Sequence, residues 1–294
     1  MARSLFKKTW FKKPWIWIQF SVLFFAGCTF RSKKKVPLRQ KQNVPAEILE
    51  QKVKQERPVI TVWVHGTRAI SKTIFPHFFR AVPGIHHASA YNNKNNLLRI
   101  AHALDSADPK DFAFKNMYMF GWDGRLSVKR RKNAARKLYK EILELREQAK
   151  KKYGVMPFLR IVTHSHGGNV TLYMAEIQDE FNEKFNVDEL VLLACPVQKR
   201  TSDFIQDNMF TNIYSFYSKI DMIQVLDPQG LQKVWSRKEK RKPGTPLFSQ
   251  RTFPEQDNLK QIKVRMNGRS LRHIDFILEK FLKELPRMLN EIRS

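Results

Sequence analysis

The stretch Phe158-Leu-Arg-Ile-Val-Thr-His-Ser-His-Gly-Gly-Asn-Val170 is the part of the chain that decides its fold. An apolar, β-branched run leads into Ser165, which stands between two histidines, and a helix-like run from Asn169 to Ala175 leads out. A strand that turns directly into a helix brings the two elements close together, so the turn needs small residues. Gly167 and Gly168 meet that need after the serine. The stretch therefore predicts a sharp strand–turn–helix connection with Ser165 at the turn.

Apolar runs on both sides of this turn indicate further strands. We expect six in all, within residues 58–64, 116–120, 159–162, 189–194, 212–217 and 262–266. Residues 70–115 show weak periodicity, and we expect loops and short helices there. A long helix is predicted from an apolar stripe at spacings of three and four residues, with Gly154 as its stop; the stripe consists of Ala135, Leu138, Ile142, Leu145 and Ala149.

Two more helices are expected, one over residues 169–181 and a final one at the C-terminal end. The final helix should hold the apolar residues Ile274, Ile277, Leu278, Phe281 and Leu285. Strands that alternate with helices predict a mostly parallel sheet covered by helices on both faces. Ligands of such sheets bind beyond the carboxyl ends of the strands, so the residues that follow each strand are the candidates for function.

Four polar segments stand at these strand ends. His65-Gly66-Thr67 follows the first strand, Ser165 the third, Asp221 the fifth and His273 the sixth. The chain order Ser, Asp, His resembles that of the α/β-hydrolase superfamily, on the side of its serine esterases and lipases. The resemblance covers roughly Pro58 to the C-terminus and implies a three-layer α/β-hydrolase fold with a mostly parallel central sheet.

The turn of that family carries the signature G-x-S-x-G. Here the five residues are Thr163-His164-Ser165-His166-Gly167, so a threonine replaces the first glycine. The resemblance implies that Ser165 is the nucleophile and that His273 is the base that activates it and later protonates the leaving group. It also implies that Asp221 orients His273, and that the backbone N–H groups of Thr67 and His166 form the oxyanion hole.

Several neighbouring residues leave alternatives open. His65, Gly66 and Trp122 are candidates for lining the substrate site, although His65 also suits a role as a hydrogen bonder that shapes its turn. His164 is a sterically poor alternative base. Asp227 and Asp275 compete with Asp221, but Asp227 suits a turn before proline and Asp275 suits the start of a helix. Aromatic residues within Phe75–Asn96 could cover an acyl pocket or belong to the core; they are Phe75, Phe78, Phe79 and Tyr91.

The N-terminal segment is typical of a secretory signal. A basic stretch precedes the thirteen apolar-rich residues Trp15–Gly27, which are fewer than the roughly 20 needed to span a bilayer. The segment ends in Phe25-Ala26-Gly27-Cys28, which resembles the lipobox of bacterial lipoproteins, although Phe25 stands where Leu, Val or Ile is usual. We expect residues 1–27 to be a signal peptide, residues 28–57 a lipidated Cys28 and basic tether, and residues 58–294 the hydrolase domain. The alternatives are an uncleaved anchor and a plain secretory signal.

The charge of the chain favours acidic partners. Loss of residues 1–27, with five basic and no acidic side chains, would lower the formal net charge from +27 to +22. Nucleic acid is an unlikely partner because the charge is dispersed, no zinc-finger or RNP motif is present, and the signal indicates export. We expect anionic lipid to bind the clusters Lys33–Lys35 and Arg237–Lys242, with a merely solvated basic surface as the alternative.

The remaining metal and thiol candidates are weak. His86 and His87 are adjacent and should face opposite ways in an extended chain, and no Cys, His or Asp set has metal-ligand spacing, so no metal or cofactor is expected. Cys195 lies in an apolar run and should be a buried thiol. The sequence thus predicts a lipoprotein of the bacterial cell envelope, facing the periplasm or exterior, that cleaves carboxylic esters by an acyl-enzyme route. The alternative is a catalytically inactive hydrolase fold that serves as a membrane-surface binding module.

Overall fold

The computed structural model describes residues 57–67, 81–92, 95–225 and 249–294. Several predictions fall outside these ranges, namely those on Cys28, Lys33–Lys35, Phe75, Phe78, Phe79, Asp227 and Arg237–Lys242. Within the described ranges, none of the helices combines the length and the apolar character needed to cross a bilayer.

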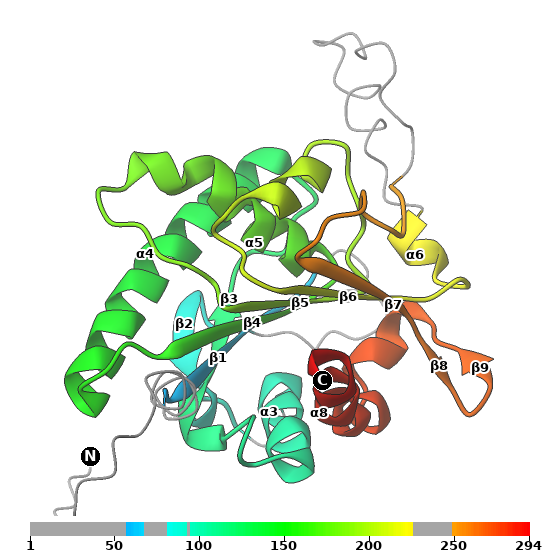
Figure 1. The fold of residues 1–294 in the computed structure, drawn as a ribbon, viewed down its shortest axis with the longest axis horizontal. Coiled ribbons are helices and arrows are strands. Elements are labelled where there is room, and N and C mark those ends of the chain that lie inside the picture. Colours follow the sequence, from blue (N-terminus) through cyan, green and yellow to red (C-terminus); the bar gives the residue numbers. More distant parts are fainter. Residues whose placement is uncertain (1–56, 68–80, 93–94, 226–248) are drawn as a thin grey trace, which may run out of the picture. The chain divides into compact units, whose positions relative to one another are not determined.

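A seven-stranded sheet forms the centre of the fold, as Figure 1 shows. Its order is β2-β3-β1-β4-β5-β6-β7, and every neighbouring pair is parallel except β2 with β3. The predicted mostly parallel α/β architecture is therefore confirmed. The strands are β1 (Val59–Val64), β2 (Gly84–His87), β3 (Met117–Gly121), β4 (Phe158–His164), β5 (Glu189–Leu193), β6 (Ile213–Tyr217) and β7 (Leu259–Lys263).

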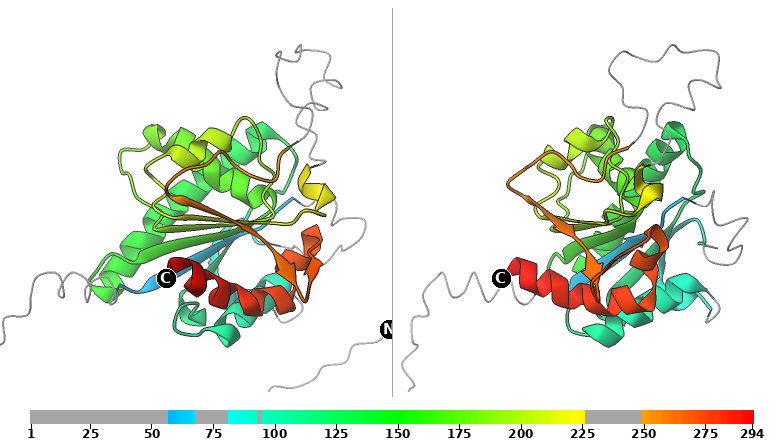
Figure 2. Two further views of the ribbon diagram at one scale, coloured as in Figure 1. Left: turned by 45° about the vertical axis from the view of Figure 1, so that its right-hand side comes forward. Right: turned by 90° about the vertical axis from the view of Figure 1, so that its right-hand side faces the viewer.

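Helices cover both faces of the sheet. In Figures 1 and 2, α4 (Val128–Tyr153) and α5 (His166–Ile177) lie on one side, and α3 (Asn96–Ala107) and α8 (Glu279–Arg293) on the other. Successive strand residues point to opposite faces, and both faces of this sheet are buried, which explains the continuous apolar runs. In β4, for example, Ile161 packs in the core under α4 and α5, whereas Val162 packs in the core under α3 and α8.

Short helices connect these elements. They are the 3-10 turns η1 (Ala88–Ala90), η2 (Phe114–Asn116), η3 (Gln178–Glu180), η4 (Ser202–Gln206) and η5 (His273–Ile277), and the one-turn helix α6 (Met222–Val225). The long predicted helix is confirmed as α4, whose stripe residues are buried. It ends at Gly154, which takes the left-handed conformation with φ 76° and lets its N–H bond the carbonyl of Lys150.

The predicted sixth strand over residues 262–266 is displaced in the structure. β7 ends at Lys263, and the chain continues into a small hairpin of β8 (Arg265–Met266) and β9 (Arg269–Ser270). The cause is the Asn267-Gly268 turn, where φ is 50° and 75°. Positive φ at both central residues is the requirement of a type I′ turn, for which Asn-Gly is the strongest short signal. The apolar residues of 262–266 thus extend over two different strands, β7 and β8.

Three other expectations need correction. The final helix is broken at the extended residue Leu278, which separates η5 from α8, so the apolar series spans two elements. Helix α5 begins at His166, directly after the turn, and not at residue 169. In residues 70–115, where only loops and short helices were expected, the described part contains the antiparallel edge strand β2 and the twelve-residue α3. Strand β2 was not predicted because it is short and has little apolar alternation.

A buried ion-pair network joins the C-terminal helix to the amino-terminal ends of β4 and β5. Arg160 lies 2.6 Å from Glu189 and 2.8 Å from Asp111, and Arg293 of α8 lies 2.7 Å and 2.8 Å from the same two carboxylates. Burial alone would raise the pKa of Asp111, but the charges and hydrogen bonds of the two arginines outweigh it and lower that pKa. The network holds α8, and with it the preceding η5, on the sheet.

Candidate active site

Ser165 occupies a strained turn between β4 and α5. Its backbone angles are φ 54° and ψ −132°, a region that side chains other than glycine rarely adopt. The turn is held on both sides, because the N–H of Ser165 donates to the carbonyl of Leu193 at 2.9 Å and its carbonyl accepts from the N–H of Gly168 at 3.0 Å. The predicted strand–turn–helix connection is confirmed, and Ser165 stands at its centre.

The two glycines after the serine leave no room for a side chain. A Cβ at Gly167 would lie 2.3 Å from the carbonyl oxygen of Val64, and one at Gly168 would lie 2.5 Å from the sulfur of Cys195. Thr163, in place of the signature's first glycine, is fully buried, and its hydroxyl donates to the carbonyl of Val191 at 3.2 Å. The threonine therefore fits because its polar group is satisfied by the neighbouring strand.

Asp221 and His273 meet across the carboxyl edge of the sheet. Nδ1 of His273 lies 2.7 Å from Oδ2 of Asp221, although the residues are 52 positions apart in the chain. Because a carboxylate only accepts, the ring donates from Nδ1, which leaves Nε2 as the nitrogen that can accept a proton. The side chain of Asp221 is completely buried, while that of His273 retains some exposure.

The second oxygen of Asp221 is also held. Oδ1 accepts from the backbone N–H of Gln224 at 3.0 Å, so the aspartate caps the short helix α6 while it binds His273. The side chain of Gln224 in turn donates to the carbonyl of Cys195 at 2.7 Å, just beyond β5. Arg251 donates to the backbone carbonyl of Asp221 at 3.2 Å. These contacts fix the carboxylate relative to the sheet.

His164 braces the backbone of His273. Its Nε2 donates to the carbonyl of His273 at 3.0 Å, and the two ring centroids are 4.8 Å apart. Complete burial and then the nearby His273 lower the pKa of His164 to about 3, so its ring is neutral at ordinary pH. His164 precedes Ser165 directly, and this contact therefore joins the two ends of the candidate site.

The turn after β1 packs against the serine. A Cβ added to Gly66 would lie 2.8 Å from Cβ of Ser165, so the backbone here approaches the serine closely. His65 is fully buried; its Nδ1 donates to the carbonyl of Gly66 at 2.7 Å and its Nε2 accepts from the N–H of Trp122 at 3.2 Å. The indole of Trp122 donates to the carbonyl of His65 at 2.8 Å. His65 and Trp122 thus shape the turn that presents Gly66 and Thr67.

His166, the other candidate for the oxyanion hole, opens helix α5. N–H groups in the first turn of a helix point out of its end, toward the residues that precede the helix. The His166 ring is buried, and its Nδ1 accepts from the guanidinium of Arg131 at 3.0 Å. Arg131 is itself buried and also donates to the side chain of Gln198 at 3.1 Å. The guanidinium of Arg131 therefore holds the ring of His166 in place.

Other predicted residues have structural roles. Asp275 accepts from the N–H of Arg272 at 2.8 Å and starts η5, as expected for a residue at a helix start. Tyr91 is buried in the core under α3 and α8, and Cys195 is a buried thiol outside any disulfide, as predicted. In the described ranges, no cluster of three or more His, Cys, Asp or Glu residues is arranged to hold a metal ion.

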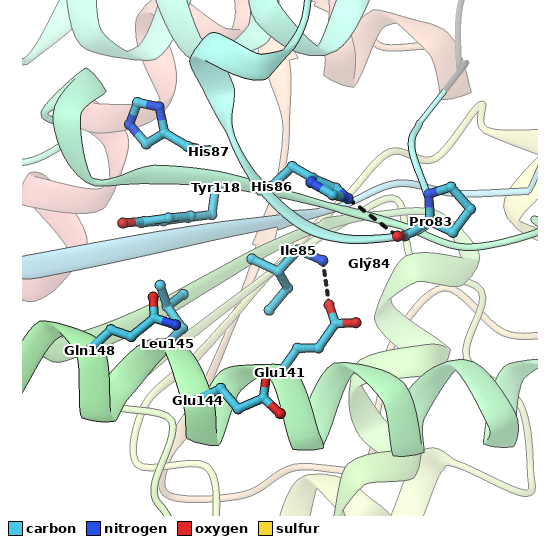
Figure 3. Close-up of a pocket in the computed structure, with 10 residues that line it drawn as sticks. All are labelled: Pro83, Gly84, Ile85, His86, His87, Tyr118, Glu141, Glu144, Leu145 and Gln148. Atoms are coloured by element: carbon cyan, nitrogen blue, oxygen red, sulfur yellow. Dashed lines mark hydrogen bonds between the residues drawn. The ribbon is translucent and has the colours of Figure 1, made fainter.

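A groove at the edge of the sheet lies apart from these residues. Figure 3 shows it between β2 and α4, with the side chain of Glu141 accepting a hydrogen bond from the N–H of Ile85. His86 donates to the carbonyl of Pro83 at 3.2 Å, whereas His87 bonds Ser89, so the two neighbouring rings have separate partners. In the strand order, β3 and β1 stand between this edge and β4.

Sequence reasoning missed Gln224 and Arg131, and it considered His164 only as an alternative base, not as the donor to the His273 carbonyl. Only Gln224 carried a usable signal, because an aspartate three positions before it is the spacing of a helix N-cap. The other two contacts join segments far apart in the chain. Comparison with known proteins adds no assignment: no protein-family model matches this chain, and no curated protein matches it.

Proposed function

We propose that this chain is a serine hydrolase of the α/β-hydrolase type that cleaves carboxylic esters. The observation that carries the proposal is the hydrogen bond of 2.7 Å between His273 and the buried Asp221. It lies at the carboxyl ends of the parallel strands, where Ser165 occupies its strained turn. A buried carboxylate that fixes a histidine by Nδ1 is the arrangement that prepares Nε2 to act as a base. The close approach of Gly66 to Ser165 gives further support, since it brings the Thr67 segment to the serine.

The chemistry would follow from these positions. Nε2 of His273 takes the hydroxyl proton of Ser165 as the oxygen attacks the ester carbonyl, and Asp221 stabilises the resulting imidazolium. The N–H groups of Thr67 and His166 bind the oxyanion, a contribution of roughly 3–4 kcal/mol for each donor. His273 then protonates the leaving alcohol. Water, activated by the same ring, hydrolyses the acyl-enzyme and restores Ser165.

A fluorophosphonate probe tests the assignment. The wild-type chain should gain the probe's mass on the peptide that contains Ser165, and Ser165→Ala should remain unlabelled. Ser215→Ala is the matched control, because Ser215 is another buried serine of the sheet and should not affect labelling. Absence of labelling in a folded wild-type chain would overturn the proposal and favour an inactive fold that binds membrane surfaces. Esters of increasing acyl length would then define the substrate of an active enzyme.

We also propose that the hydrolase is exported and anchored to a bacterial membrane by lipid on Cys28. The support is the Phe25-Ala26-Gly27-Cys28 end of a short apolar segment. One acyl chain binds a membrane only marginally, so a stable anchor requires at least two chains or one chain with a basic patch. Intact-mass measurement of the membrane fraction should show loss of residues 1–27 and added lipid mass; a chain that keeps these residues contradicts this part.

A further inference from the structure

The segment that holds Asp221 turns its polar side chains inward and its apolar ones outward. Asp221 and Gln224 are buried, with their side-chain hydrogen bonds inside the fold. Ile220 precedes Asp221, and Met222 and Ile223 lie between Asp221 and Gln224. These three side chains are 51%, 55% and 41% exposed, which places them among the most exposed large apolar residues of the described chain. Three such residues gathered in one short segment form a patch of the kind that marks an interaction site, unlike scattered single ones.

Cationic side chains lie on the neighbouring segments. Lys219 directly precedes it and interacts with Lys263, which pairs with Tyr217 in the β6–β7 ladder. The hairpin that follows β7 adds two exposed cations, Arg265 and Arg269. Lys219 and then Arg265 help to lower the pKa of Lys263, as expected where like charges crowd together.

The charge of this region is not balanced by acids. Residues 258–273 contain five basic side chains and no Asp or Glu. Asp257 directly precedes this stretch, but it lies before the amino-terminal end of β7, away from the hairpin. Asp275, which follows the stretch, is already paired with Arg272 at 3.2 Å. Apolar side chains flanked by uncompensated cations match the surface of an anionic bilayer, which offers acyl chains below a layer of negative headgroups.

We infer that this surface, formed by Ile220, Met222 and Ile223 with Lys219, Lys263, Arg265 and Arg269, docks the folded domain onto an anionic lipid bilayer. It is a second membrane contact, separate from the lipid on Cys28, and goes beyond the proposed hydrolase activity. Figures 1 and 2 show α6 and the β8–β9 hairpin at the same end of the sheet. This is the carboxyl edge that holds Ser165 and His273, so docking turns the candidate active site toward the lipid.

A nucleic acid could bind the four cations, but it would leave the three exposed apolar side chains without a partner. None of the seven residues of this surface is aromatic, so none can stack on a base. A bilayer uses both parts of the surface. Each Lys or Arg close to an anionic membrane strengthens binding by roughly fivefold, so reversal of three of them should weaken docking by at least about a hundredfold.

Hydrogen–deuterium exchange of the full-length chain tests the inference, because it locates contact regardless of the N-terminal anchor. The Ser165→Ala variant is used so that hydrolysis cannot alter the vesicles, and the result does not depend on catalytic activity. With phosphatidylglycerol vesicles, peptides covering residues 219–225 and 263–272 should become protected. With phosphatidylcholine vesicles they should remain as in solution.

Two further variants complete the experiment. The triple variant Lys219→Glu, Lys263→Glu, Arg265→Glu should lose this protection. The matched control Lys140→Glu, Lys150→Glu, Lys151→Glu makes the same change of charge on exposed lysines of α4 and should keep it. Equal protection by both lipids, loss of protection in the control variant, or protection by an RNA oligonucleotide in place of vesicles would each overturn the inference.

Discussion

His273 donates from Nδ1 to Asp221 over 2.7 Å while its backbone carbonyl accepts from His164 over 3.0 Å. Asp221, which follows β6, thus holds the ring of His273, and His164, at the end of β4, holds its backbone. The two contacts have different chemical consequences, because the first sets the tautomer of the ring and the second sets its position relative to Ser165. They can therefore be separated by mutation.

Asp221→Asn should lower kcat by about four orders of magnitude and leave KM nearly unchanged. An asparagine can still cap α6 through its oxygen, so the fold should survive, but it no longer fixes the Nδ1–H tautomer of His273. Asp275→Asn is the control, since Asp275 bonds Arg272 at the start of η5. Steady-state kinetics on a soluble ester decide the matter: a larger loss from Asp275→Asn or Asp227→Asn than from Asp221→Asn would reject Asp221 as the orienting acid.

His164 should act as a positioning residue. His164→Ala removes the donor to the His273 carbonyl, and we expect kcat to fall by roughly ten- to a hundredfold with little change in KM, because a small misplacement of the base slows the chemical step. His164→Gln should restore much of the rate, since its amide nitrogen can donate over a similar reach. A Gln variant as slow as the Ala variant, with both as stable as wild type, would argue against positioning through this hydrogen bond.

The same histidine predicts a pH dependence of stability. Its pKa is about 3 in the folded protein and about 6.5 in the unfolded chain, so the unfolded state binds more protons between these values. Stability from the neutral ring is complete above pH 6.5 and is lost as the pH falls toward 3. By pH 5 the loss should be about 2 kcal/mol. Urea unfolding should show that the unfolding free energy falls less between pH 8 and pH 5 in His164→Gln than in wild type. An equal fall in both proteins would exclude His164 as a cause of the pH dependence.

The ion-pair network should matter more than the exposed pairs of the same helix. Arg293→Met leaves the buried Glu189 with only Arg160, and we expect a loss of about 2–4 kcal/mol in unfolding free energy. Arg287→Met is matched in residue and helix, but Arg287 and its partners Glu284 and Glu291 are exposed, so the loss should be below about 1 kcal/mol. Chemical denaturation measures both, and similar losses would contradict a special role for the buried network.

Much of the fold was predictable because its signals are local. The strands β1, β3, β4, β5 and β6 are largely apolar runs, as expected where both faces of a parallel sheet are buried. The turn at Ser165 was predictable because the two following glycines answer a steric demand of the turn itself. The failures were also local in origin. The apolar series in 262–266 and 274–285 continued across the Asn267-Gly268 turn and the extended Leu278, where backbone conformation overrides periodicity.

The sequence by itself determined the order Ser165, Asp221, His273 and the strand ends that Ser165 and Asp221 follow, because parallel strands align their carboxyl ends on one side of the sheet. Only the tertiary structure decided that Asp221 reaches His273, that His164 holds the backbone behind that ring, and that Ile220, Met222 and Ile223 face outward among lysines and arginines. These are contacts between segments distant in the chain, or orientations of a short turn. They depend on how the carboxyl ends of the strands, α6 and η5 pack together, and this packing cannot be predicted from periodicity or spacing.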